Sequence, residues 1–108
     1  MKTKPKIIDS VKPELLNQLE AVSNYTYLTY TDGSRQLSSY SLKVFAEIFT
    51  PKDFIRINRS LLVNRSFVKK YIKAGGKEYL QLKNDQTFII PRRKTESLKL
   101  DFPSIFNN

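Results

Sequence analysis

The 108-residue chain contains neither cysteine nor histidine. Without cysteine it can form no disulfide and no thiolate metal site, and without histidine it lacks the most common general base and metal ligand. Its ten carboxylates are scattered, and most lie beside lysine or arginine, where a solvated ion pair explains them. A glycine-rich phosphate loop is also missing, and Ser60 has no histidine partner for a triad. We therefore expect no enzymatic activity, no metal and no cofactor.

Long hydrophobic runs are missing as well. No stretch approaches the roughly 20 apolar residues of a membrane span, and no signal-peptide core follows the basic start MKTKPKIIDS. These absences predict a soluble, cytoplasmic protein with no membrane partner. The length fits one domain, and the 40% of hydrophobic residues is ordinary for a globular protein. We interpret residues 1–14 as a basic arm and residues 15–108 as the folded domain.

Positive charge is in excess, and it is unevenly placed. The formal net charge is +9. Residues 51–100 hold thirteen Lys and Arg against four Asp and Glu, whereas residues 1–50 hold six against five. A basic excess confined to one half fits a polyanionic partner, most often nucleic acid. A merely basic, solvated surface is the alternative.

Short strand patterns separated by turn signals cover the first third of the chain. The spacing of Leu15, Leu19 and Val22 would suit a helix, but Pro13 and the strand pattern that follows favour a strand over residues 16–22. Two further strands are predicted over 25–31 and 35–39, joined at Asp32-Gly33 by a type I′ turn with positive φ at both central residues.

The rest of the chain continues the same pattern around one helix. Apolar residues spaced by three and four predict a short helix within 41–49, which Ser39 or Ser41 can cap. Later strands flank the turns at 74–76 and 84–86, and a final helix is expected over 94–100, ended by Pro103. The sequence thus predicts a mostly β domain built of antiparallel hairpins.

The segment FIRINRSLLVNRSFVKK (54–70) combines two apolar clusters with several hydrogen-bonding side chains. If the clusters are buried, they hold Asn-Arg-Ser at the surface as a short, stiff loop, which lowers the cost of ordering on binding. Arginine presents a planar fork that matches phosphate or the guanine edge, and Asn and Ser add the neutral groups that base edges require. NRS together with the later RRK therefore favours sequence reading. The alternative is that these side chains simply cover the edge of a sheet.

FIRINRSLLVNRSFV resembles the central motif of the LytTR-type DNA-binding domain, usually F-x-R-I-H-R-S-x-L-V-N followed by an apolar residue. Four more segments follow the family's order, and together they extend the resemblance over about residues 15–100: LEAVSNYTYLTYTDG, SLKVFAEIF, KAGGKEYLQLKND and PRRK. The resemblance implies an elongated β-β-β arrangement of short antiparallel sheets, with one short helix between and a short C-terminal helix. Asn58 stands where the motif has His, Pro91 where Ser is usual, and Lys94 where an aromatic residue is common.

The resemblance also implies a function in bacterial transcription regulation. Family members bind specific duplex DNA through loops that enter successive major grooves, commonly as two copies on direct-repeat promoter sites. Most carry a receiver or membrane-sensor domain before this module, so the chain is expected to be a stand-alone regulator or the output domain of a response regulator. The base-contacting candidates lie in three places: Asn24, Tyr25 and Thr26; Asn58, Arg59 and Ser60; and Arg92 and Arg93, which are expected to precede the last helix. The phosphate-contacting candidates are Arg56, Arg65, Lys69 and Lys94.

The sequence is also compatible with two other kinds of partner. An isolated domain of this kind could be a protein-interaction module that pairs with a LytTR-type regulator and modulates it. A basic β domain with exposed tyrosines could also stack on single-stranded DNA or RNA. However, Tyr25, Tyr27 and Tyr30 cannot all lie on one side of a strand.

Overall fold

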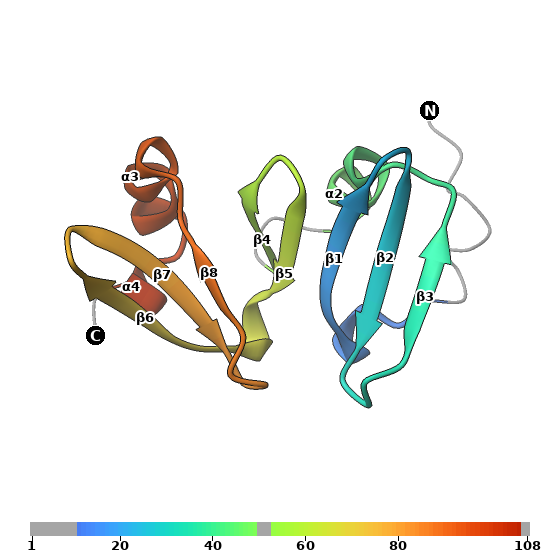
Figure 1. The fold of residues 1–108 in the computed structure, drawn as a ribbon, viewed down its shortest axis with the longest axis horizontal. Helices are drawn as coiled ribbons and strands as arrows, with labels where there is room; N and C mark the ends of the chain where they lie inside the picture. The colour runs from blue at the N-terminus through green and yellow to red at the C-terminus, as the bar shows by residue number, and fades with distance from the viewer. Residues whose placement is uncertain (1–10, 50–52, 107–108) are drawn as a thin grey trace.

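A computed structural model describes residues 11–49 and 53–106, which form two antiparallel sheets with three short α-helices packed on them (Figure 1). The molecule measures 42 × 31 × 25 Å along its principal axes. The mostly β fold with short antiparallel strands and few short helices is therefore confirmed. No helix among the described residues is long and apolar enough to cross a membrane.

The first sheet has five strands and the second has three. The strand order in the first sheet is β3-β2-β1-β5-β4, with bounds β1 Leu16–Val22, β2 Tyr25–Tyr30, β3 Arg35–Ser38, β4 Phe54–Asn58 and β5 Leu61–Asn64. The second sheet has the order β6-β7-β8, with bounds β6 Val68–Ala74, β7 Lys77–Leu82 and β8 Thr87–Ile89. The helices are α2 Leu42–Ile48, α3 Arg92–Asp101 and α4 Pro103–Phe106, with 3-10 turns η1 Pro13–Leu15 and η2 Arg65–Phe67.

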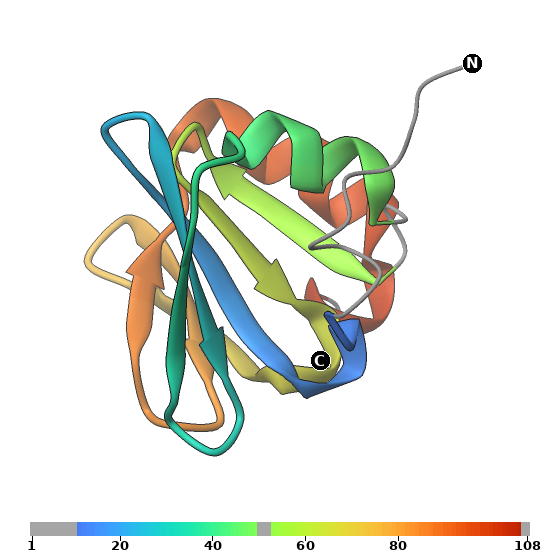
Figure 2. The same ribbon diagram turned by 90° about the vertical axis from the view of Figure 1, so that its right-hand side faces the viewer.

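The β4–β5 hairpin lies between two hydrophobic cores. Successive side chains of a strand point to opposite faces. Phe54 and Leu62 accordingly enter the first core, where α2 contributes Phe45 and the sheet contributes Leu19 and Leu28. The opposite face of the hairpin enters the second core, formed with the three-stranded sheet, α3 and α4; its residues from the hairpin are Ile55, Ile57, Leu61 and Val63. Figure 2 shows α2 on one side of the five-stranded sheet, with the three-stranded sheet on the other side. Both apolar clusters around NRS are thus buried.

The hairpin turns lie where the sequence predicted them, but the predicted turn type is not always the observed one. The predicted type I′ turn at Asp32-Gly33 is wrong, because only Gly33 has a positive φ, of 90°. Gly33 N donates to Tyr30 O (2.9 Å) and Tyr30 N donates to Ser34 O (2.8 Å), which makes a three-residue loop with one left-handed residue. The pair of positive φ values occurs instead at Gly75 (60°) and Gly76 (77°), between β6 and β7.

The final helix begins earlier than the sequence predicted. α3 starts at Arg92 rather than at residue 94, with Pro91 before it, and Lys94 N donates to Pro91 O (2.8 Å). Arg92 and Arg93 therefore lie in the first helical turn and not before the helix. The sequence predicted that Pro103 ends the final helix. In the structure α3 ends at Asp101, and Pro103 is the first residue of α4, a position that tolerates proline. Ser41 occupies the N-cap position of α2, but its side chain makes no capping hydrogen bond.

The basic arm predicted over 1–14 falls mainly outside the described residues, which begin at residue 11. Val11 is 6% exposed and packs in the first core. Strand β1 begins at Leu16, so the strand interpretation of 16–22 is confirmed and the helical one is wrong.

Candidate nucleic-acid interface

Three segments that carry predicted base-contacting residues lie along one edge of the molecule. They are the β1–β2 turn, the β4–β5 turn and the start of α3, all at the top of Figure 1 and again at the top of Figure 2. Ala21 N, near the end of β1, donates to Ser60 O in the β4–β5 turn at 2.8 Å, which joins two of the three segments directly. We call this surface the arginine edge, and define it by residues 23–25, 58–60 and 91–94.

The β4–β5 turn has an unusual backbone for its length. Asn58 pairs with Leu61, so Arg59 and Ser60 are the two turn residues, and neither has a positive φ. Two-residue hairpin turns favour positive φ because it matches the twist of the strands. Here the register shifts by one residue between Arg56 and Asn58, which places a bulge at Ile57. The turn therefore depends on contacts other than backbone preference for its shape.

Those contacts occupy every carbonyl of the turn. Arg56 Nε donates to Asn58 O and Arg56 Nη2 donates to Arg59 O, both at 2.8 Å, while Ser60 O accepts from β1. Asn58 Oδ1 accepts from Ser60 N at 2.7 Å, which closes an Asx turn. The side chain of Arg59, by contrast, is exposed and makes no hydrogen bond or ion pair within residues 11–49 and 53–106. A rigid turn thus presents one arginine with an unoccupied fork.

A hollow of about 440 Å³ separates the β4–β5 turn from the start of α3. Four cationic side chains and no carboxylate line it; the lining residues are Arg56, Asn58, Arg59, Pro91, Arg93 and Lys94. Burial lowers the pKa of the Arg56 guanidinium, so this part of the site is partly shielded from water. Charges of one sign in a concave, partly desolvated site focus the field outward and attract anions.

The two adjacent arginines of α3 serve different sides of the helix, because successive helical residues are rotated by about 100°. Arg93 lines the hollow with Arg59, whereas Arg92 lines a second one with Gly75, Gly76 and Lys77 of the β6–β7 turn. Lys77 is not among the phosphate-contacting candidates that the sequence predicted. The glycine pair directly before it was the available signal that a tight turn brings this end of β7 to a concave surface.

A polar cluster fixes α3 against the three-stranded sheet. Lys99 Nζ lies 3.4 Å from Glu78 Oε1 on β7, and the Tyr71 hydroxyl on β6 donates to the same carboxylate. The Tyr71 hydrogen bond lowers the pKa of Glu78, with a smaller contribution from Lys99. Burial, together with Glu78, raises the pKa of Tyr71 to about 12. This cluster holds the last turn of α3 against the three-stranded sheet.

The first predicted segment divides between surface and interior. Ser23 and Asn24 form the β1–β2 turn, in which Ser23 has φ 55°, and Asn24 and Tyr25 are exposed. Thr26 is fully buried, and its hydroxyl donates to Tyr40 O at 2.8 Å. The structure therefore corrects the assignment of Thr26, which holds the chain between β3 and α2 and is not on the surface.

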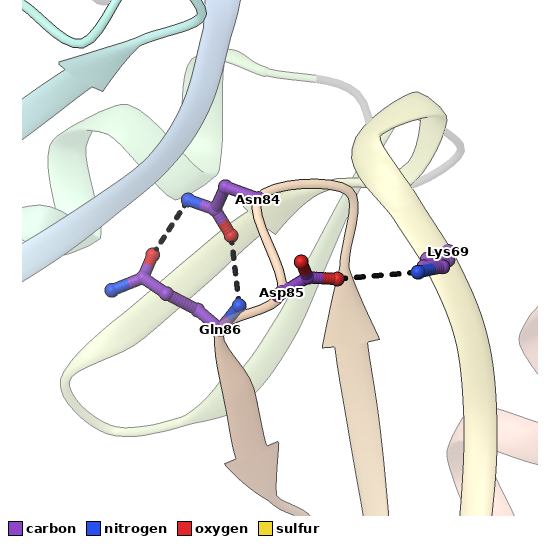
Figure 3. A network of polar contacts seen from close by, with 4 residues as sticks. All are labelled: Lys69, Asn84, Asp85 and Gln86. Carbon is purple, nitrogen blue, oxygen red and sulfur yellow. Dashed lines mark hydrogen bonds and ion pairs between the residues drawn. The ribbon is translucent and has the colours of Figure 1, made fainter.

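Two predicted phosphate contacts lie away from the arginine edge. Arg65 is in η2, where Nη2 donates to Ser104 Oγ (3.0 Å) and the guanidinium lies 5.8 Å from the Phe102 ring centroid. Lys69 Nζ contacts Asp85 Oδ1 of the β7–β8 turn at 3.2 Å (Figure 3). Both η2 and the β7–β8 turn are at the bottom of Figure 1. Of the phosphate-contacting candidates, only Arg56 and Lys94 line the hollow beside Arg59.

Comparison with known proteins agrees with this architecture. The sequence matches the LytTr DNA-binding domain family over residues 8–102. Among solved structures, the fold is similar to the LytTr DNA-binding domain of a protein described as a methyl-accepting/DNA response regulator from Bacillus cereus, with a TM-score of 0.74 and 22% identity over 84% of each chain. No curated protein matches the sequence. The family is a DNA-binding one and not a catalytic one. Its match covers most of the chain, so this protein belongs to the LytTr DNA-binding domain family, and that membership implies DNA binding in transcription regulation.

Proposed function

We propose that the chain recognises a specific duplex DNA sequence by inserting the turns of the arginine edge into major grooves. One observation carries the proposal: Arg59, which has no partner within residues 11–49 and 53–106, projects from a turn whose three carbonyls all accept hydrogen bonds, beside a hollow without carboxylates that it shares with Arg93 and Lys94. A pre-ordered turn loses little entropy on binding, and an unoccupied guanidinium fork matches the O6 and N7 atoms of guanine.

The residues of the arginine edge divide by chemistry. Arg59 and Arg92 are proposed to read guanines, with Arg93 as a further base contact across the hollow from Arg59. Asn58 and Ser60 supply the neutral groups for neighbouring base edges, although the Asn58 oxygen already accepts from Ser60 N. Asn24 and Tyr25 on the β1–β2 turn are proposed to contact a flanking stretch. Lys94 lines the first hollow and Lys77, outside the arginine edge, lines the second; both fit phosphate contacts.

The experiment starts from the duplex that the wild-type chain selects from a randomised library, compared with a scrambled duplex of equal composition. Replacing Arg59 or Arg92 by alanine should weaken the selected duplex by about 1–3 kcal/mol and the scrambled duplex much less. Lys69→Ala is the matched control, because Lys69 is paired with Asp85 away from the arginine edge, and it should leave both affinities unchanged. The affinity of the wild type should also fall with rising salt, with a slope of log K against log salt of roughly −2 for the two proposed phosphate contacts, Lys94 and Lys77.

Equal weakening of both duplexes by Arg59→Ala would show that this arginine only holds phosphate, and sequence reading by the β4–β5 turn would be rejected. A slope of log K against log salt near zero would show that the basic residues 51–100 do not bind DNA.

Two copies on a direct repeat are the proposed assembly on DNA. The edge offers a few short segments, which is little surface for specificity, so a second site along the duplex adds affinity through effective concentration. Sedimentation of the complex on selected duplexes should give two chains on a repeat and one on a single half-site. One chain on both would contradict the assembly.

A protein-interaction role is the second candidate, and an uncovered sheet face favours it. On the side of β1, β2 and β3 away from α2, Val22 pairs with Tyr25 and Tyr27 pairs with Leu37. Val22, Tyr25 and Leu37 are 44%, 49% and 51% exposed. Leu37→Glu should leave the binding of a single half-site unchanged if this face serves a protein partner. Loss of that binding would assign the face to DNA instead.

A further inference from the structure

Arg56 is the one arginine of the central motif whose side chain is turned back onto its own hairpin. Its Nε and Nη2 atoms donate to two successive carbonyls, those of Asn58 and Arg59, each at 2.8 Å. This pair of adjacent donors is the fork that would otherwise grip phosphate or carboxylate in a bidentate manner. A phosphate could use the same fork only by displacing both turn carbonyls.

The path of the side chain explains how it reaches the turn. Arg56 pairs with Leu62 on the face of the hairpin that enters the first core, next to Phe54. It also lines a small cavity between α2 and α3 that includes Phe49 and Leu62. The aliphatic part of Arg56 is thus packed on apolar residues, while its guanidinium reaches past the Ile57 bulge to the turn.

The turn needs this support for two reasons. Neither Arg59 nor Ser60 has the positive φ that favours a two-residue hairpin turn. The carbonyls of Asn58 and Arg59 also lie on one side of the hairpin, where the Arg56 side chain donates a hydrogen bond to each. If these two bonds were lost, the Asx turn of Asn58 and the bond from Ala21 N to Ser60 O would remain, but the direction of Arg59 would no longer be fixed.

We propose that Arg56 is a positioning residue, which fixes the direction of Arg59 by holding the two carbonyls before Ser60, and that it is not a phosphate contact. The inference rests on the proposed function, because it assigns Arg56 a part in sequence preference and none in general affinity. It also predicts that the charge of Arg56 is not sufficient for its role, since a lysine ammonium is a point charge on a flexible stem and cannot reproduce the planar fork.

Arg56→Lys separates the two roles. A positioning role predicts that Arg56→Lys weakens the selected duplex by roughly fivefold or more, the scale of one lost bidentate base contact. Affinity for the scrambled duplex and the salt slope should stay as in the wild type. Lys94→Gln is the control for a phosphate contact in the same hollow, and it should weaken both duplexes and make the slope shallower by roughly one.

Two results would overturn the inference. In the first, Arg56→Lys binds both duplexes like the wild type while Arg56→Gln behaves like Lys94→Gln, which is the pattern of a phosphate contact. In the second, both Arg56 variants keep the wild-type preference. Arg59→Ala, measured alongside, distinguishes this failure from that of the proposed function: if it retains sequence discrimination, the reading role of the turn fails, whatever Arg56 does.

A measurement on the wild-type chain keeps the test independent of how the variants fold. Because Arg56 Nε–H is bonded to a carbonyl, NMR should show its exchange with water to be much slower than that of Arg59 Nε–H. Equal exchange rates for the two groups would overturn the inference.

Discussion

The β4–β5 and β7–β8 turns use the same local device and differ in where their charges go. In each, an asparagine Oδ1 accepts from the backbone N–H two residues later: Asn58 from Ser60 at 2.7 Å, and Asn84 from Gln86 at 3.0 Å. In the β7–β8 turn the nearby cation is neutralised, because Lys69 lies 3.2 Å from Asp85 (Figure 3). The β4–β5 turn carries Arg59 with no such partner among the described residues.

The difference teaches that the position of carboxylates decides where the basic excess can act. Thirteen cations occupy residues 51–100, but a lysine paired with aspartate on the surface offers little to a polyanion. Beside the β4–β5 turn, Arg56 holds two backbone carbonyls, and Arg59, Arg93 and Lys94 line a hollow that has no carboxylate in its lining. The number of cations in the sequence therefore overestimates how many can bind a polyanion. Their contacts with carboxylates in the structure show which ones remain available.

The largest expected effect concerns the strands that support each turn. Ile57, directly before the β4–β5 turn, is fully buried in the second core, whereas Ile89 on β8 is 49% exposed. Ile57→Ala should lower the free energy of unfolding by about 2–5 kcal/mol, the usual range for a buried large-to-small change. Ile89→Ala, its matched control, should lower it by about 1 kcal/mol or less. Urea denaturation of both variants measures the contrast, and equal losses would mean that the two turns rest on equally packed strands.

An intermediate effect comes from removing the asparagine of each turn. Asn58→Ala and Asn84→Ala each lose one side-chain bond to a backbone N–H, so both should lower the free energy of unfolding by about 0.5–1.5 kcal/mol. Only Asn58→Ala should also reduce the preference for the selected duplex over the scrambled one. The comparison between the turns breaks down if Asn84→Ala reduces that preference as much, since the β7–β8 turn would then belong to the interface.

The smallest effect concerns the cluster that fixes α3 beside the β4–β5 turn. Because the folded pKa of Glu78 is lowered from 4.5, its contribution to stability is present above that value and is lost as the pH falls through the folded pKa. Glu78→Gln should be less stable than the wild type at pH 7, and the gap should narrow below about pH 4.5. Urea denaturation at pH 7 and at about pH 3 tests this. A gap that is independent of pH would show that the Glu78 charge does not hold α3.

Much of the fold could be predicted from the sequence, because its signals are local. Alternating strand residues, the glycine pair at 75–76 and the spacing of Leu42 and Phe45 each specify a nearby element. The family motif located the β4–β5 turn, and both of its flanking apolar clusters are buried. The helix start at Arg92 was missed because Pro91 was noted only as a replacement for the usual Ser, whereas its fixed φ suits the residue before a helix.

The directions of several candidate side chains could not be predicted, because they depend on long-range strand register. Thr26 is interior because β2 packs its even-numbered residues toward α2, which depends on pairing with β1 and β3. Arg56 and Arg59 are three residues apart, yet the bulge at Ile57 turns one toward the turn carbonyls and leaves the other outside. Lys69 is separated from the arginine edge because η2 leads from β5 into β6, the first strand of the second sheet, at the end of the hairpin opposite the β4–β5 turn. No composition or motif signal reports these directions.

The hairpin β4–β5 is shared by both cores, and this has a consequence for how the molecule comes apart. Phe54 and Leu62 belong to one core while Ile55 and Val63 belong to the other, so loss of either core leaves an apolar face of the same two strands bare. Unfolding should therefore be a single cooperative transition, in which neither half survives alone. Cutting the chain between β5 and β6 would leave the first core complete in the N-terminal fragment, with the other face of the hairpin bare, and would divide the second core between the two fragments. The strands β4 and β5, which support the turn with Arg59, are also the last that the fold can release locally, so the amide protons bonded between them should exchange only with global opening.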